Sequence, residues 1–398
     1  SESGSLAFAG MTLGSTATWM IFIAFGIKAA FPLLNGWLQD AYPEATVVGT
    51  VVLSSFTTKL AIYALARGFA GTDLLILIGC LMTAFPVFFA VIENDMRRVL
   101  AYSLNNQLGF MVVAIGIGTE LAINGAVAHA FAHIIYKGLL FMSMGAVLYR
   151  VGTVKASELG GLYKSMPWTM VFCIVGAMSI SAFPLFSGFA AKSLIMSALG
   201  YKGLVAAYLV LLAASAGVLH HSGIKIPYFA FFGHDGGHKV KEAPLGMLVA
   251  MGAASALCIG IGSLPGLFYK ILPYSIDYNP YDASHVLGQM ELLIFSILAF
   301  TFLMWFGFYP PELKSTVLNT DWLYRRLAVQ AGRPVLWAIV AVWTSFVCAI
   351  AGYRDAIWSA VERLVHAPIT GPTVPGRAVL VQTLVLVAIL AIGYLFAS

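Results

Sequence analysis

Four lysines stand inside long apolar stretches of this chain, and they constrain its fold more than any other feature. They are Lys28, Lys59, Lys137 and Lys192. The chain is 60% hydrophobic and only 10% charged, so these stretches predict membrane-spanning helices, each of roughly 20 apolar residues. A charge at membrane depth costs about 3 kcal/mol on insertion scales, which marks such lysines as functional candidates. Together they predict a path for charge.

The apolar stretches predict an all-α, polytopic transmembrane helix bundle in a lipid bilayer. We expect a core at 1–274, a loop at 275–290 and a C-terminal transmembrane tail at 291–398. Twelve loop lysines and arginines, Lys225 among them, fall on one side of the predicted membrane and six on the other. The first side is therefore predicted to be cytoplasmic. About eleven spans are expected, near 14–34, 46–66, 72–92, 99–118, 121–149, 168–198, 203–222, 245–269, 291–309, 335–352 and 378–397.

Two of the predicted helices contain a proline next to a lysine. Pro32 follows Lys28 by four residues, and Pro184 precedes Lys192 by eight. Proline lacks an N–H donor and clashes with the carbonyl four residues earlier. Broken helices at membrane depth are tolerated where they line a cavity or a hydrated path. We therefore expect helix breaks at Pro32 and Pro184, each beside a functional lysine.

A third predicted helix carries a polar stripe. His129, His133 and Lys137 recur every four residues and so share one helix face. Histidine titrates near neutral pH and burial brings lysine toward it, so the stripe suits proton transfer. Two histidines at this spacing can also bind zinc, but no acidic or cysteine ligand nearby completes that site. Lys59 belongs to the same path or is a packed, hydrogen-bonded structural lysine.

Other residues give little sign of chemistry. The acidic residues fall at predicted helix ends or loops, so no carboxylate lies at mid-membrane. His234, Asp235 and His238 can chelate a metal, although a cytoplasmic turn is the simpler interpretation; His220 and His221 receive no role. The cysteines form no CxxC pair and the basic residues form no nucleic-acid patch. No cofactor, metal or nucleic-acid partner is expected.

Several motifs occur in a characteristic order: FGIKAAFPLLNGWLQDAYPEA (25–45), ENDMRRVLAYSLNNQLGF (93–110), HAFAHIIYKGLLFMSMG (129–145) and SISAFPLFSGFAAKSLI (179–195). This order resembles the antiporter-like membrane subunits shared by respiratory complex I, membrane-bound hydrogenases and Mrp-type cation/proton antiporters. KIPYFAFFGHD (225–235) is most similar to the D-type antiporter subunit. A full member of the family has a preceding half, with a glutamate that pairs with the lysine corresponding to Lys28.

The resemblance implies a proton path of Lys28, Lys59, His129, His133, Lys137 and Lys192. It implies a subunit of a multisubunit Na⁺/K⁺–proton antiporter in a bacterial inner membrane, a secondary transporter rather than an enzyme. Its partners would be the other subunits, protons and monovalent cations. One alternative is a proton-pumping subunit of a complex I-type NADH–quinone oxidoreductase or membrane-bound hydrogenase, and another is a non-transporting scaffold.

Overall fold

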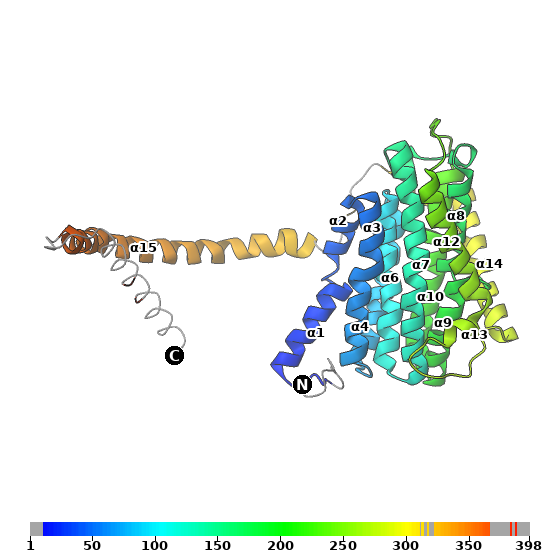
Figure 1. Ribbon diagram of the computed structural model, residues 1–398, viewed down its shortest axis with the longest axis horizontal. Coiled ribbons are helices and arrows are strands. Elements are labelled where there is room, and N and C mark those ends of the chain that lie inside the picture. Colours follow the sequence, from blue (N-terminus) through cyan, green and yellow to red (C-terminus); the bar gives the residue numbers. More distant parts are fainter. Residues whose placement is uncertain are drawn as a thin grey trace, which may run out of the picture. The chain divides into compact units, whose positions relative to one another are not determined.

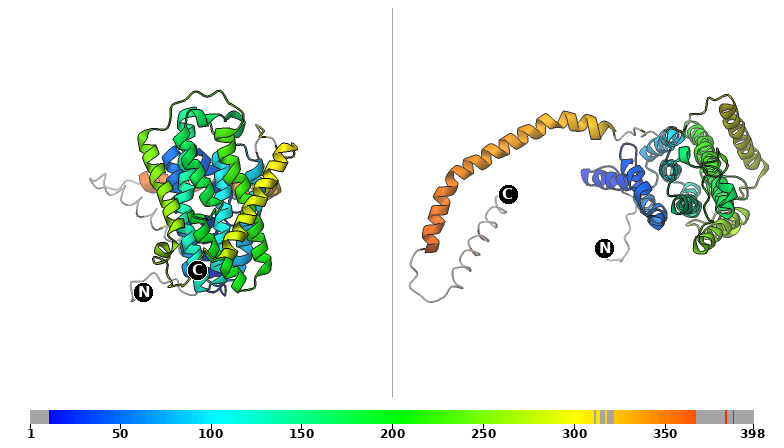
Figure 2. Two further views of the ribbon diagram at one scale, coloured as in Figure 1. Left: turned by 90° about the vertical axis from the view of Figure 1, so that its right-hand side faces the viewer. Right: turned by 90° about the horizontal axis from the view of Figure 1, so that it is seen from above.

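The computed structural model describes residues 11–310, 312–313, 317, 322–366, 383 and 387. These residues are largely helical and contain no strand, only an isolated bridge between Asp95 and Lys155. The chain divides into two compact units, Ser1–Asp321 and Trp322–Ser398. In the first unit the long helices lie side by side as a bundle (Figures 1 and 2). The expected all-α fold is confirmed.

The first unit contains most of the helices. They are α1 (Thr16–Ala29), α2 (Gly36–Glu44), α3 (Val47–Val52), η1 (Leu53–Thr57), α4 (Thr58–Gly68), α5 (Leu74–Ile92), α6 (Met96–Ile117), α7 (Glu120–Val151), η2 (Ala156–Glu158), η3 (Leu162–Lys164), α8 (Pro167–Ile180), α9 (Ser187–Tyr201), α10 (Val205–Val218), η4 (Leu219–Ile224), α11 (Lys225–Pro227), η5 (Tyr228–Phe232), α12 (Leu245–Ser263), α13 (Pro265–Tyr269) and α14 (Ala283–Trp305). The second unit contains η6 (Leu323–Ala328) and α15 (Val329–His366).

Among the described residues, eight helices are long and apolar enough to cross a membrane. They are Val47–Gly68, Leu74–Ile92, Met96–Ile117, Glu120–Val151, Val205–Phe232, Leu245–Ser263, Ala283–Trp305 and Tyr324–Val347; Thr16–Ala29 and Pro167–Ile180 are shorter apolar helices. The expected span at 335–352 lies within α15, and the one at 378–397 lies outside the described residues except at two positions. The count of eleven spans stays a prediction.

The expected loop at 275–290 is shorter than the sequence suggested. Helix α14 already begins at Ala283, because the Asp282 side chain accepts the backbone N–H of His285 at 2.8 Å. An aspartate that caps a helix N-terminus in this way satisfies one of its free N–H groups.

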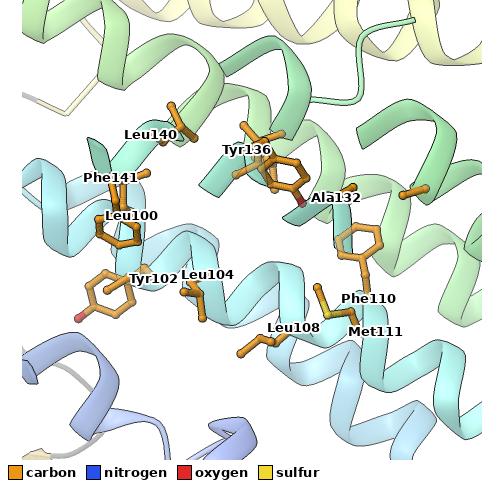
Figure 3. Close-up of a cluster of buried hydrophobic side chains, with 14 of the residues drawn as sticks. Leu100, Tyr102, Leu104, Leu108, Phe110, Met111, Ala132, Tyr136, Leu140 and Phe141 are labelled. Atoms are coloured by element: carbon orange, nitrogen blue, oxygen red, sulfur yellow. The ribbon is translucent and has the colours of Figure 1, made fainter. Parts of the chain in front are cut away.

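Helix α6 lies at the centre of the bundle. All of its residues except Arg98 are buried, and it packs against α5 and α7. Helix association in a membrane depends on close backbone approach at small residues, since lipid is as apolar as the helix surfaces. Gly79 of α5 and Gly109 of α6 provide that approach. Figure 3 shows the contact of α6 with α7, where the labelled side chains include Leu104, Leu108, Phe110, Ala132, Tyr136 and Leu140.

Loops from distant parts of the sequence meet at the two ends of the bundle. At one end, Met96 donates to the Val154 carbonyl (3.0 Å) and Ala156 to that of Asn94 (2.8 Å). At the other, Gly71 donates to the Ile115 carbonyl at 2.9 Å. We call the first the basic end, because Lys155 lies in this loop and Arg97 and Arg98 follow the Asn94 carbonyl in sequence. It is the upper end of the bundle in Figure 1.

Replacing Gly79 with alanine should weaken the contact between α5 and α6. A Cβ at this position would lie 2.6 Å from the Val113 nitrogen and 2.7 Å from the Gly109 oxygen. We expect Gly79→Ala to cost about 2 kcal/mol, as overpacking usually does, with a lower thermal midpoint for the purified assembly in detergent. Gly260→Ala is the matched control, because a Cβ there meets nothing within 4 Å. Equal midpoints for the two variants would refute this packing.

Candidate functional site

Two turns between helices, which we call interruptions, have the same sequence and conformation; one lies between α1 and α2 and the other between α8 and α9. Ala-Phe-Pro-Leu occurs at 30–33 and again at 182–185. Both alanines are left-handed, with φ of 63° at Ala30 and 58° at Ala182, and so are the two leucines, at 69° and 73°. Left-handed non-glycine residues are strained by about 1 to 3 kcal/mol each, and such strain gathers at functional sites. The repeat is therefore a functional candidate.

The helices end before the prolines. Phe31 donates to the Gly26 carbonyl at 2.9 Å, and Phe183 donates to the Met178 carbonyl at 3.1 Å. These are the closing bonds of a Schellman turn, in which a left-handed residue terminates the helix and proline often follows. The left-handed alanine therefore ends each helix, so the clash expected between Pro32 and the Lys28 carbonyl does not arise.

Lys192 lies at the second interruption. Its Nζ donates to the Ile180 carbonyl at 2.9 Å and lies 5.0 Å from the centre of the Phe110 ring. The ammonium thus occupies the C-terminal end of α8, where the helix dipole is negative. The side chain is buried, yet it also lines a cavity of about 350 Å³ with His285, Gln289 and Glu291. Lys192 therefore connects the interior to an open pocket.

Lys28, at the first interruption, does not lie where we expected. It is exposed, and its Nζ lies 5.6 Å from the centre of the Trp37 ring. Helix α1 packs on α4 through the face that holds Phe22, Gly26 and Ala29, and Lys28 lies off that face. The expected burial of Lys28 is thus not found in this chain, and its place in the path stays a prediction.

Lys59 is buried beside a π-helical turn. Its Nζ donates to the Ser54 carbonyl and lies 3.5 Å from the Thr58 hydroxyl. Widened turns of this kind are frequent at functional sites. The hydrogen bonds also fit a structural lysine, so the two interpretations of Lys59 both stay open.

The stripe on α7 lies fully inside the bundle. His129, His133 and Lys137 have no exposed surface. The His129 Nε2 bonds the Tyr136 hydroxyl at 3.2 Å. Among the described residues, the His129 Nδ1, both ring nitrogens of His133 and the Lys137 Nζ have no hydrogen-bond partner. A buried unpaired polar group costs about 1 to 3 kcal/mol, so structural cores avoid it. Four such nitrogens in one row indicate a functional role.

Helix α6 supplies polar groups opposite this stripe. The Tyr136 hydroxyl donates to the Gln107 Oε1 at 3.2 Å, Gln107 donates to Asn106 at 2.6 Å, and Asn106 donates to the Thr83 carbonyl at 2.5 Å. The histidine stripe is therefore connected to a buried amide network that reaches α5.

Two buried groups were not expected from the sequence. Lys225, which we counted as a loop residue, has no exposed surface, and neither has His221. The count was wrong for Lys225 because the helical segment of α10 continues through η4, α11 and η5 to Phe232. A signal was present: His221 and Lys225 repeat the four-residue spacing of His133 and Lys137.

The loop at 233–238 forms a turn. Asp235 pairs with Lys164 at 3.1 Å and accepts the backbone N–H of Gly237 at 2.9 Å. These contacts, the backbone bond first, lower the pKa of the Asp235 carboxyl. Within the described part of the chain, no group of three or more His, Cys, Asp or Glu side chains is arranged to hold a metal ion.

Residues 6–219 match the transmembrane family described as NADH:quinone oxidoreductase/Mrp antiporter. The chain belongs to this family. It is 29% identical over 301 residues to hydrogenase-4 component B of Escherichia coli, covering 65% of this chain and 44% of that protein. It is 34% identical over 227 residues to the D-type subunit of the Na⁺/H⁺ antiporter of Alkalihalophilus pseudofirmus, covering 54% and 45%. The chain therefore spans less than half the length of these curated relatives.

A solved structure shares the fold. The chain aligns with one in the Mrp complex from Dietzia sp. DQ12-45-1b with a TM-score of 0.62 and 25% identity, covering 66% of this chain and 60% of that one. With its membrane-spanning helices, the chain is thus an antiporter-like membrane protein.

Arg97, within the motif at 93–110, joins the first interrupted helix to the centre of this family fold. Its guanidinium donates to the carbonyls of Pro43 (2.8 Å), Ala45 (2.8 Å) and Thr46 (3.3 Å) and to the hydroxyl of Thr50. Only the planar fork of arginine spans this set of acceptors. Arg97 thus fixes the turn between α2 and α3 against α6.

Arg97→Lys should destabilise the protein by about 2 kcal/mol, since hydrogen bonds to charged groups contribute about that much. Arg98→Lys is the neighbouring control, because Arg98 is partly exposed and pairs with Asp40 at 3.5 Å, which contributes about 1 kcal/mol or less. Thermal unfolding of the detergent-solubilised assembly measures both. A midpoint for Arg97→Lys no lower than that of Arg98→Lys would contradict the anchoring role.

Proposed function

We propose that this chain is a proton-translocating subunit of a multisubunit Na⁺/K⁺–proton antiporter, of the D type, in a bacterial inner membrane. The observation that carries the proposal is the row of fully buried, unpaired nitrogens along α7, at His133 and Lys137. Its partners would be the other subunits, protons, monovalent cations and the surrounding lipid.

The buried bases lie on helices that pack against one another. Helix α7, which holds His129 and Lys137, packs against α9, which holds Lys192, and against α4, which holds Lys59. In a low-dielectric interior, one positive charge disfavours a second nearby. A proton that enters at one end of the row therefore favours release of a proton further along. Such coupling suits a relay in which few sites are charged at once.

The path we propose runs across the bundle. Lys59, beside η1, and Lys192, at the break before α9, flank the α7 stripe, and the cavity at Lys192 supports an opening between α9, α10 and α14. Lys28 would be the terminal member on the α1 side. Its exposed position makes it suited to accept a carboxylate partner from outside the described residues.

A second candidate is a proton-pumping subunit of a redox-driven complex. The 29% identity to hydrogenase-4 component B over 65% of this chain supports it. Purification of the assembly with its native partners separates the two proposals. Small antiporter subunits would support the first, and flavin or iron–sulfur subunits the second.

Replacing Lys137 with methionine should abolish most cation-dependent proton exchange. Methionine keeps the volume of the buried chain but cannot carry a proton, so we expect a loss of about a hundredfold, typical of a missing proton-transfer group. The assay is Na⁺- and K⁺-dependent proton flux in vesicles that contain the full-length protein with its operon partners.

Lys164→Met is the matched control, since Lys164 is exposed and pairs with Asp235 at the basic end. It should exchange protons like the wild type. If Lys137→Met assembles and retains full exchange, the proton path is refuted and the scaffold alternative gains support.

A further inference from the structure

A second histidine–lysine pair is buried near the basic end of the bundle. His221 lies in η4 and Lys225 begins α11, and neither has any exposed surface. The η4 turn packs against α5, α6, α8, α10 and α14, so it is enclosed by the bundle. Two ionisable groups in such a position need a structural or a functional explanation.

The hydrogen bonds of His221 leave one nitrogen free. Ser222 donates its hydroxyl to the Ser103 hydroxyl at 2.8 Å, so its oxygen is available to accept from the His221 Nδ1, also at 2.8 Å. The neutral ring then holds its hydrogen on Nδ1 and presents a basic Nε2. In the part of the chain that the structure describes, this Nε2 is buried without a hydrogen-bond partner. A structural histidine would satisfy both nitrogens, whereas His221 is oriented to accept a proton.

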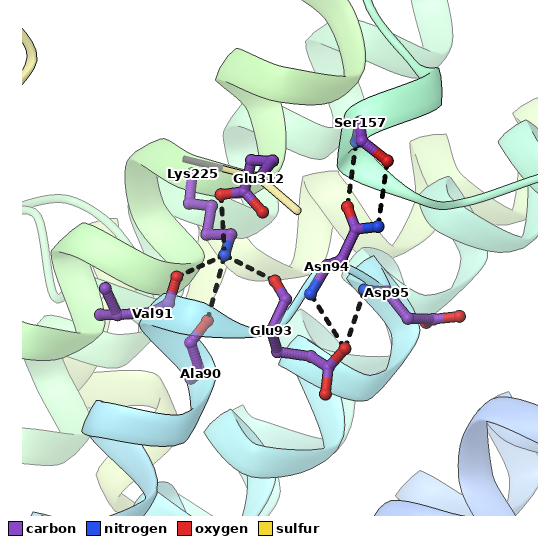
Figure 4. Close-up of polar contacts among 8 residues, drawn as sticks. All are labelled: Ala90, Val91, Glu93, Asn94, Asp95, Ser157, Lys225 and Glu312. Atoms are coloured by element: carbon purple, nitrogen blue, oxygen red, sulfur yellow. Dashed lines mark hydrogen bonds and ion pairs between the residues drawn. The ribbon is translucent and has the colours of Figure 1, made fainter. Parts of the chain in front are cut away.

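Lys225, four residues after His221, contacts backbone carbonyls and one carboxylate at the basic end (Figure 4). Its Nζ donates to the carbonyls of Val91 and Glu93, both at 2.6 Å, at the C-terminal end of α5. It also pairs with the Glu312 carboxylate at 3.0 Å. Burial raises the pKa of the Glu312 carboxyl and of the Glu93 carboxyl. Both carboxyls thus bind protons more readily than exposed ones.

The packing of the helices places the pair near the α7 stripe. The η4 turn that holds His221 packs against α6 and α8, and both of these helices also pack against α7, which holds Lys137. His221 and Lys137 therefore share two neighbouring helices inside the bundle.

We infer that His221 and Lys225 form a branch of the proton path between Lys137 and Glu312 at the basic end. The Lys225 ammonium first gives a proton to the Glu312 carboxylate with which it pairs, which leaves a Lys225 amine and a neutral Glu312 that releases the proton at the basic end. The Lys137 ammonium then gives a proton to the His221 Nε2, and the imidazolium gives a proton to the Lys225 amine. Lys137 and His221 are then neutral, and the Lys225 ammonium and the Glu312 carboxylate are restored. This inference rests on the proposed function. It assigns the basic end of the bundle as the place where the protons of the branch enter or leave.

The test compares His221→Gln with His220→Gln in vesicles containing the full-length protein and its partners. His220 is the matched control, because it is adjacent, only partly buried, and packs edge-on against Phe300 at 5.8 Å between ring centres. We expect His221→Gln to lower the rate of exchange at least about tenfold, which is less than the full rate contribution of a proton-transfer residue. His220→Gln should stay within about twofold of the wild type, as expected for a residue outside the transfer step.

The pH profile of exchange separates proton transfer from packing. His221→Gln should alter the profile in the assembled protein, since it removes one proton-carrying group of the branch while Lys137, Lys225 and Glu312 remain. A uniform loss of rate at every pH would indicate a structural role and overturn the branch. If His221→Gln fails to assemble, Ser222→Ala replaces it: lowered exchange supports the branch and unchanged exchange overturns it.

Lys137→Met in the same vesicles separates the two proposals. If it loses exchange while His221→Gln keeps it, the branch is overturned and the proposed function stands. If it keeps exchange, the proposed function fails, and the branch fails with it because it begins at Lys137.

Discussion

The structure depends on the free energy of placing basic nitrogens where no water is available. His133 and Lys137 are fully buried and unpaired on α7, at a cost of a few kcal/mol for the row. The surrounding helices offset this cost through tight packing, above all at the glycine contact between α5 and α6. A close-packed interior also holds the bases at fixed separations, which proton transfer requires. The tight packing at the centre of the bundle therefore stabilises the protein against the cost of the unpaired nitrogens on α7.

At the ends of two helices, backbone carbonyls and buried lysine side chains satisfy one another's hydrogen bonds. A broken helix exposes carbonyls that have lost their partners, and Lys192 donates to one of them, the Ile180 oxygen. Lys225 does the same at the end of α5. In both places a helix C-terminus stabilises an ammonium inside the bundle. At Lys192 the main-chain carbonyl stabilises the ammonium, whereas at Lys225 the Glu312 carboxylate adds to the carbonyls.

Much of this arrangement could be predicted from the sequence, because helical periodicity and apolar length are local properties. The face shared by His129, His133 and Lys137 follows from their spacing, and the family fold from the order of the motifs. The burial of Lys225 and His221 was not predicted, because π-helical turns extend their helix well past an ordinary span. The exposure of Lys28 was not predicted either, since burial depends on which neighbouring helices cover a face. The sequence of a single helix determines neither the burial nor the exposure of these side chains.

The most direct test of a coupled relay is the protonation state of His133, followed by ¹⁵N magnetic resonance in the membrane-embedded assembly. If the α7 row is electrostatically coupled, His133 should change protonation state within the pH range of transport. The pH of that change should also shift when Lys137→Met removes the neighbouring charge. A His133 ring that stays in one state across this range, in both proteins, would contradict the relay.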